Sequence, residues 1–147
     1  MATQIDPRGP RFGAAITATA LLATVYLLLD VSTATAGIWL YAIVTASFAV
    51  GAIFGVTKHP YAWLFKTLVR PRLGAPSELE DATPPRFAQA VGLFVVSVGI
   101  ILQISGVELG LVFAAGAAFV AAFLNAAFNY CLGCQIFLGL KRLKVIR

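Results

Sequence analysis

The sequence predicts an all-α membrane protein. We expect four transmembrane helices, arranged as two helical hairpins that repeat in parallel, with both termini in the cytoplasm. Three observations predict this class. The 147 residues are 60% hydrophobic and only 12% charged, whereas soluble domains carry about 25% charge. Four segments approach the roughly 18 apolar residues that cross a bilayer as a helix. The basic residues gather in alternate connections between these segments.

The four expected spans are about 13–29, 37–57, 87–104 and 110–130. The first and third are near the short limit, and Gln103 interrupts the third close to its end. Together they use most of the chain and leave no soluble catalytic domain. We therefore expect one membrane domain over residues 1–147.

Orientation follows from the positive-inside rule, because Lys and Arg gather on the cytoplasmic side of membrane helices. All 11 Lys and Arg residues precede the first span, lie between the second and third, or follow the fourth. The two other connections contain only Asp30 and Glu108 as charged residues. This predicts cytoplasmic termini and a cytoplasmic central loop. The net charge of +5 fits contact with anionic lipid headgroups, and the bases do not form a nucleic-acid pattern.

The first span has one competing interpretation. Residues 33–36 (TATA) resemble the small-residue cleavage site of a signal peptide. The apolar core is somewhat long for that, and an internal repeat argues against removal of the first span.

An internal repeat aligns the two halves without a gap at an offset of 75 residues. Pro10-Arg11-Phe12 falls on Pro85-Arg86-Phe87, and Lys66 falls on Lys141. We expect a first repeat over about 10–72, a linker over 73–84 and a second repeat over about 85–147. A parallel repeat of this kind has its pseudo-twofold axis along the membrane normal. Segment 58–72 is expected to be an interfacial amphipathic helix that Pro60 opens and Pro71 ends.

Cys131 and Cys134 are the two cysteines of the chain and form a C-x-x-C pair at the cytoplasmic end of the fourth span. Such a pair can exchange electrons with another dithiol, bind a soft metal or relay sulfur. The alternative without chemistry is that the two cysteines are simply small buried apolar residues. The repeat favours chemistry, because the matching positions hold Val56 and His59. Cys131 and Cys134 are the candidate catalytic residues.

Asn125 and Asn129 are equally specific to the second half, where the first half holds Val50 and Phe54. One interpretation is that their amides bond to polar groups of neighbouring helices, such as Thr45, Ser47 or Ser97. The other is that they line a site beside the thiols. An uninterrupted helix places the cysteines roughly opposite the asparagines, so a shared site requires a bend or break near Leu132-Gly133, which Gly133 permits. The sequence leaves open whether the helix breaks there. The same break decides reactivity, because the C-terminal dipole of a continuing helix opposes thiolate formation.

A metal site is incomplete on sequence grounds, because a closed zinc site needs four ligands and the chain has two thiols. His59, the one histidine, is the remaining candidate ligand for a Cys-Cys-His site, although it is more simply an interfacial residue before Pro60. The sequence contains no nucleotide loop, catalytic triad or haem-attachment motif. It therefore names no cofactor, and it carries no dedicated marker for a quinone.

The paired Pro-Arg-Phe entries, the stretch 59–72 (HPYAWLFKTLVRPR) and residues 129–137 (NYCLGCQIF) resemble domain-of-unknown-function family 4395 over nearly the whole chain. The resemblance implies a small bacterial plasma-membrane protein of uncharacterised activity. It also implies neighbours that are thioredoxin-like or sulfurtransferase proteins, and it assigns no catalytic residue.

The leading hypothesis is a membrane thiol–disulfide or sulfur-relay protein whose Cys131 and Cys134 react with a cytoplasmic thioredoxin-like or rhodanese-like partner. One alternative is a small transporter of a soft metal or sulfur compound. Another is a structural subunit with inert cysteines. The sequence leaves open whether the protein is an enzyme, and it says nothing of oligomeric state.

Overall fold

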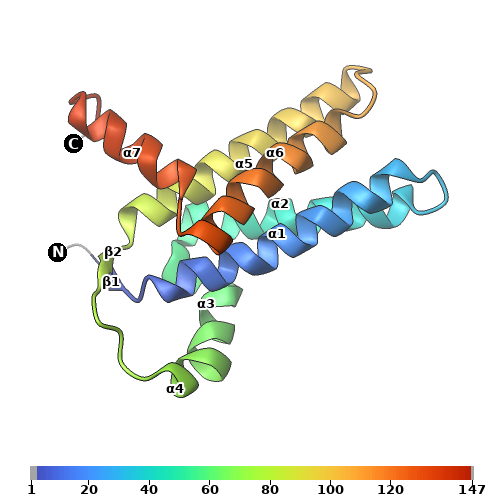
Figure 1. Cartoon of the computed structure of the whole chain (residues 1–147). Helices are drawn as coiled ribbons and strands as arrows, with labels where there is room; N and C mark the ends of the chain where they lie inside the picture. The colour runs from blue at the N-terminus through green and yellow to red at the C-terminus, as the bar shows by residue number, and fades with distance from the viewer. Residues whose placement is uncertain (1–2, 147) are drawn as a thin grey trace.

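Four long apolar helices form the bundle of the computed structural model, which describes residues 3–146 (Figure 1). They are α1 (Arg8–Leu29), α2 (Ala34–Phe54), α5 (Thr83–Ile104) and α6 (Gly110–Phe128). Over this part of the chain, these four are long and apolar enough to cross a membrane. The prediction of an all-α protein with four such helices is confirmed.

The helix ends differ from the sequence prediction by a few residues. α1 and α5 begin before their expected starts at residues 13 and 87, whereas α2 and α6 end before residues 57 and 130. Hydropathy detects the part of a helix that suits lipid, but helical hydrogen bonding extends into polar first turns. Proline at the first positions of α5 helps its early start, because a first-turn N–H has no helical partner to lose.

Each helix of the bundle packs against one helix of its own hairpin and one helix of the other. α1 packs on α2 and α5 on α6, and the hairpins meet through α1 against α6 and α2 against α5. Tyr41 of α2 donates its hydroxyl to the carbonyl of Val96 on α5 at 2.7 Å. The core residues come from all four helices: Leu21, Tyr41, Val44, Phe48, Val96, Ala115 and Ala118.

Two arginines join the hairpins by equivalent contacts. Arg11 of α1 donates to the carbonyl of Ala126 near the end of α6, at 3.2 Å. Arg86 of α5 donates to the carbonyls of Ala52 and Ile53 at the end of α2, each at 2.9 Å. Each guanidinium therefore satisfies carbonyls that a helix C-terminus leaves without a helical partner.

All segments outside the two hairpin turns gather at one end of the bundle. Figure 1 shows both hairpin turns at one end and the chain termini at the other. The terminal end also carries α7 (Leu132–Arg142) and the central segment, which consists of η1 (Val56–Lys58), α3 (Pro60–Leu64), η2 (Phe65–Val69) and α4 (Arg70–Leu73).

The central segment corrects the prediction that Pro71 ends its helix. Pro71 lies in α4, and the helical run continues to Leu73. The preceding turn, η2, is a π-helix. A proline in an α-helix removes a hydrogen bond and clashes with the carbonyl four residues earlier, and a wider π turn relieves that clash.

A two-stranded ribbon joins the residues before α1 to the segment that the sequence predicts to be a linker over 73–84. β1 (Gln4–Ile5) pairs antiparallel with β2 (Glu80–Asp81), and Ile5 lies opposite Glu80. Directly afterwards, the carboxylate of Asp6 accepts the backbone N–H of Arg8 and that of Asp81 accepts the N–H of Thr83. The ribbon thus fixes the starts of α1 and α5 next to each other.

Candidate functional site

The fourth long helix ends before the cysteines. α6 stops at Phe128, and Asn129 adopts a left-handed conformation with φ 56° and ψ 29°. The backbone N–H of Asn129 donates to the carbonyl of Asn125, and the N–H of Tyr130 donates to the carbonyl of Leu124. These two bonds close the end of the helix. The helix is therefore interrupted, as a shared site requires, but the chain turns at residues 129–131 rather than at Leu132-Gly133. Asparagine tolerates the left-handed region better than other residues with a Cβ, and this explains where the turn forms.

Gly133 has another role, which is close packing. It is buried in the first turn of α7, and a Cβ at this position would lie 2.5 Å from the Cα of Ala88 on α5. Glycine therefore lets the start of α7 rest directly on the backbone of α5.

Cys131 occupies the N-cap of α7. Its Sγ accepts the backbone N–H of Cys134 at 3.2 Å. The two residues form a disulfide, with a Cα–Cα distance of 5.2 Å that suits such a bond. The pair therefore lies at a helix N-terminus, whose partial positive charge favours a thiolate. The expectation of an opposing C-terminal dipole applies only to a continuous helix, and the turn at residues 129–131 removes it.

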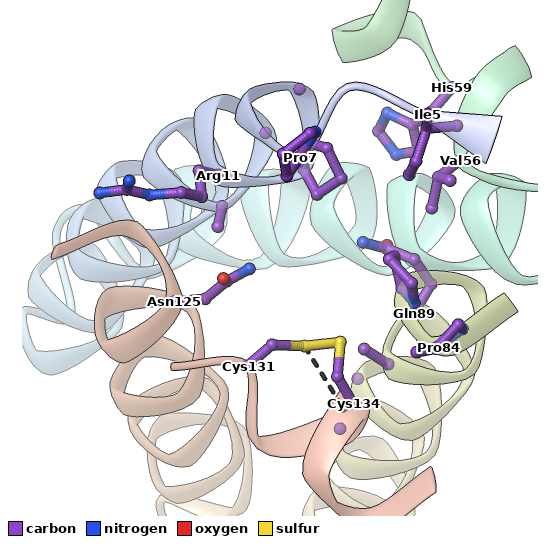
Figure 2. Close-up of a pocket in the computed structure, with 18 of the residues that line it drawn as sticks. Ile5, Pro7, Arg11, Val56, His59, Pro84, Gln89, Asn125, Cys131 and Cys134 are labelled. Atoms are coloured by element: carbon purple, nitrogen blue, oxygen red, sulfur yellow. Dashed lines mark hydrogen bonds between the residues drawn. A yellow bond between two sulfur atoms is a disulfide. The ribbon is translucent and has the colours of Figure 1, made fainter. Parts of the chain in front are cut away.

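A cavity of about 920 Å³ adjoins the disulfide at the terminal end of the bundle. Its walls come from α1, α5, α6, the first turns of α7, the β ribbon and the segment around His59. Figure 2 shows the disulfide facing this space, with the side chains of Asn125 and Gln89 directed into it. The volume lies in the range of roughly 300–1,000 Å³ that is typical of small-molecule sites.

The turn at residues 129–131 brings the asparagines and cysteines together. Asn125, Asn129, Cys131 and Cys134 all line the cavity, whereas one continuous helix would place them on opposite faces. Two of the expected partners of the asparagines are engaged elsewhere. Thr45 bonds to the carbonyl of Tyr41, and Ser47 bonds to His59. These contacts favour the site-lining interpretation for Asn125, while Asn129 also forms the turn.

His59 lines the same cavity but is held by protein groups on both ring nitrogens. Its Nδ1 accepts the backbone N–H of Tyr61 at 3.2 Å, which caps α3. Its Nε2 lies 3.0 Å from both the carbonyl and the hydroxyl of Ser47. The ring is 6% exposed, and burial lowers the pKa of His59 below its usual value. The neutral imidazole with its proton on Nε2 satisfies this geometry, because Nδ1 must accept.

The metal alternative gains no support from these positions. Over residues 3–146, no group of three or more His, Cys, Asp or Glu side chains is placed to hold a metal ion. A Cys-Cys-His site formed by Cys131, Cys134 and His59 stays a sequence prediction.

Gln89 is a site residue that the sequence reasoning missed. Its amide faces the cavity, and its Cγ packs on Gly51 of α2, where a Cβ would approach it to 2.7 Å. A signal was present in the sequence. At the 75-residue offset Gln89 falls on Ala14, so it is another polar residue of the second half with an apolar counterpart.

A bundle of helices long and apolar enough to span a bilayer, with a disulfide at the start of a further helix, defines the chain as a helical membrane protein that carries a C-x-x-C disulfide. The chain belongs to the family described as "Domain of unknown function (DUF4395)", whose model matches residues 5–142. This confirms the family resemblance. No curated protein and no solved structure matches the chain.

Proposed function

We propose that this protein is a membrane thiol–disulfide carrier in which Cys131 and Cys134 cycle between disulfide and dithiol. The observation that carries the proposal is the position of Cys131 at the N-cap of α7, with its Sγ accepting the N–H of Cys134. A helix N-terminus stabilises a thiolate both as attacking group and as leaving group, which activates C-x-x-C pairs.

The partner is a soluble protein of the thioredoxin-like or rhodanese-like class. In the redox cycle, a partner thiolate attacks one sulfur of the Cys131–Cys134 disulfide and forms a mixed disulfide. The second partner thiol then resolves it. Two electrons and two protons move from the partner to the membrane protein. Exposed Lys141 and Arg142 provide a basic docking surface at the other end of α7, about two helical turns from Cys134.

The membrane orientation is part of the proposal. All 11 basic residues lie in the terminal segments, in the segment between α2 and α5, or in the first turns of α1 and α5. From the positive-inside rule we propose that the terminal end of the bundle lies in the cytoplasm of a bacterial cell. The two hairpin turns then lie on the outer side of the plasma membrane.

The 75-residue duplication also belongs to the proposal. From Arg8 to Thr83 and from Leu29 to Ile104, the ends of α1 and α5 keep the offset found in the sequence. Arg11 and Arg86 keep it too, and their contacts at the helix ends are equivalent. These correspondences support two parallel hairpins related by a twofold axis along the membrane normal.

Differential alkylation in native membranes tests the redox role. Membranes are titrated with ratios of reduced to oxidised dithiothreitol, free thiols are alkylated with a membrane-impermeant maleimide, and modified chains are counted by mass spectrometry. We expect Cys131 and Cys134 to switch together, with modification only from the cytoplasmic side. Cys131→Ser and Cys134→Ser should each leave one thiol that never becomes protected. Two thiols that stay free at every ratio would overturn the proposal.

A further inference from the structure

We propose that the cavity beside the disulfide binds a membrane quinone, which accepts electrons from the Cys131–Cys134 dithiol. This inference rests on the proposed thiol–disulfide function and adds the class of electron acceptor. The chain has no other cysteine to which electrons could pass. Electrons that enter from a soluble partner must therefore leave to a group that is not part of this protein.

The depth of the cavity points to a ligand from the bilayer. Its lining residues on α5 run from Pro84 to Val95, which is roughly 16 Å along a helix at 1.5 Å per residue. That length is about half of a hydrocarbon core of roughly 30 Å. Such a cavity begins at the interface, where the disulfide lies, and reaches toward the bilayer centre, where apolar two-electron carriers reside.

The walls suit an apolar ring that carries two carbonyl oxygens. Apolar side chains from the long helices line one part of the cavity, including Phe48, Val95, Ala117 and Ala118, while charged side chains such as Arg11 and Glu80 line the part near the chain termini. The amides of Gln89 on α5 and Asn125 on α6 face the cavity from different helices (Figure 2). An amide NH₂ donates hydrogen bonds to carbonyl oxygens, so the two side chains can hold the two oxygens of a quinone ring beside the sulfur atoms.

The chemistry balances with the quinone as oxidant. The Cys131 thiolate adds to a ring carbon, which forms a C–S bond and moves one electron pair onto a ring oxygen. The Cys134 thiolate then attacks Sγ of Cys131, so that the S–S bond forms while the C–S bond breaks and its electron pair reduces the ring. The two thiol protons end on the two ring oxygens. One dithiol and one quinone become one disulfide and one hydroquinone.

The test uses the full-length protein in phospholipid nanodiscs, reduced and desalted under anaerobic conditions, with decylubiquinone as the probe. Thiol loss and quinone absorbance are followed together. We expect one quinone to be consumed per dithiol, with saturation kinetics. Neither Cys131→Ser nor Cys134→Ser should produce hydroquinone, because the second thiolate is needed to break the C–S bond, and Cys134→Ser should stop at the adduct of Cys131 with the quinone. Gln89→Leu and Asn125→Leu should each raise KM about tenfold, as expected for one lost hydrogen bond.

Gln103→Leu is the matched control, because Gln103 is the same residue type at the opposite end of α5, outside the cavity. It should keep the wild-type KM. Oxidation by a soluble disulfide, measured on every variant, shows that the dithiol and the fold are intact. One outcome would overturn the quinone site and leave the proposed function standing. In that outcome the dithiol exchanges normally with the soluble disulfide, but decylubiquinone oxidises it no faster than buffer without quinone does. Equal KM values for Gln89→Leu, Asn125→Leu and Gln103→Leu would also overturn it.

Discussion

The backbone N–H of Cys134 donates to the Sγ of Cys131 at 3.2 Å, so one cysteine caps the helix that carries the other. The same C-x-x-C sequence at the end of a continuous span would face the negative end of a helix dipole. The turn between α6 and α7 reverses the sign of that electrostatic effect. The proposed reactivity of the pair therefore depends on the residues that hold the turn and on the packing of α7.

Gly133→Ala should detach the first turn of α7 from α5. The new Cβ would lie 2.5 Å from the Cα of Ala88, and such backbone overlap costs about 1–3 kcal/mol. We expect a lower thermal unfolding midpoint in detergent and slower re-formation of the disulfide after reduction. Gly139→Ala is the control in the same helix, because a Cβ there meets nothing within 4 Å. It should stabilise by about 0.5–1 kcal/mol. Equal effects of the two variants would contradict this account of Gly133.

Asn129→Gly should preserve the turn, and Asn129→Val should disturb it. The residue has φ 56°, which glycine adopts without strain and a β-branched residue adopts at a cost of about 1–3 kcal/mol. We expect Asn129→Val to favour continuation of α6 and to slow alkylation of Cys131 in the reduced protein. Alkylation rates at neutral pH, measured by mass spectrometry for both variants, check this. A wild-type rate for Asn129→Val would show that other contacts alone hold the turn.

His59 should make stability depend on pH. Burial lowers its folded-state pKa below the ordinary value of 6.5, so the unfolded chain binds the proton more readily. The stabilisation from the neutral ring is present above about pH 6.5 and is lost as the pH falls toward the lower folded-state pKa. We expect the thermal unfolding midpoint to decrease as the pH is lowered from about 8 to about 5. His59→Asn keeps an acceptor for the N–H of Tyr61 but does not titrate. It should flatten this part of the profile, and an unchanged profile would exclude His59 as its source.

Arg86→Gln should loosen the contact between the hairpins more than Arg11→Gln. Arg86 makes two carbonyl contacts at 2.9 Å, whereas Arg11 makes one at 3.2 Å. Charged hydrogen bonds of this kind contribute about 1.5–3 kcal/mol each when well formed. Thermal unfolding in one detergent compares the two variants, with Arg72→Gln on exposed α4 as a control. A larger loss for Arg72→Gln than for Arg86→Gln would contradict the assignment.

The sequence predicts the four long helices because their apolar length exceeds what a soluble fold tolerates. It also singles out Cys131, Cys134 and Asn125 through their apolar or non-equivalent counterparts in the first half. It misplaces the end of the last span, because the turn depends on contacts outside that segment. Asn129 can adopt either a helical or a left-handed conformation, and the contact of Gly133 with Ala88 joins residues far apart in the chain.

The β ribbon escapes prediction for a similar reason. A pair of two-residue strands has too little local pattern to be detected, and it forms because the starts of α1 and α5 lie side by side. The π turn before Pro71 is likewise not predictable. It accommodates the proline within a packed helix, whereas the local sequence alone predicts that the helix ends there.

Ile5 lies opposite Glu80 in the ribbon, and these two residues are separated by the offset of the proposed duplication. Two separate copies of one hairpin would meet at this point if they assembled as a symmetric homodimer. In such a dimer, any residue acquired by one subunit also appears in the other. Joining the copies in one polypeptide removes that constraint. If the proposed duplication holds, one copy carries the disulfide at its last helix while the other keeps His59 as a cap, and a scaffold with twofold form holds a single disulfide.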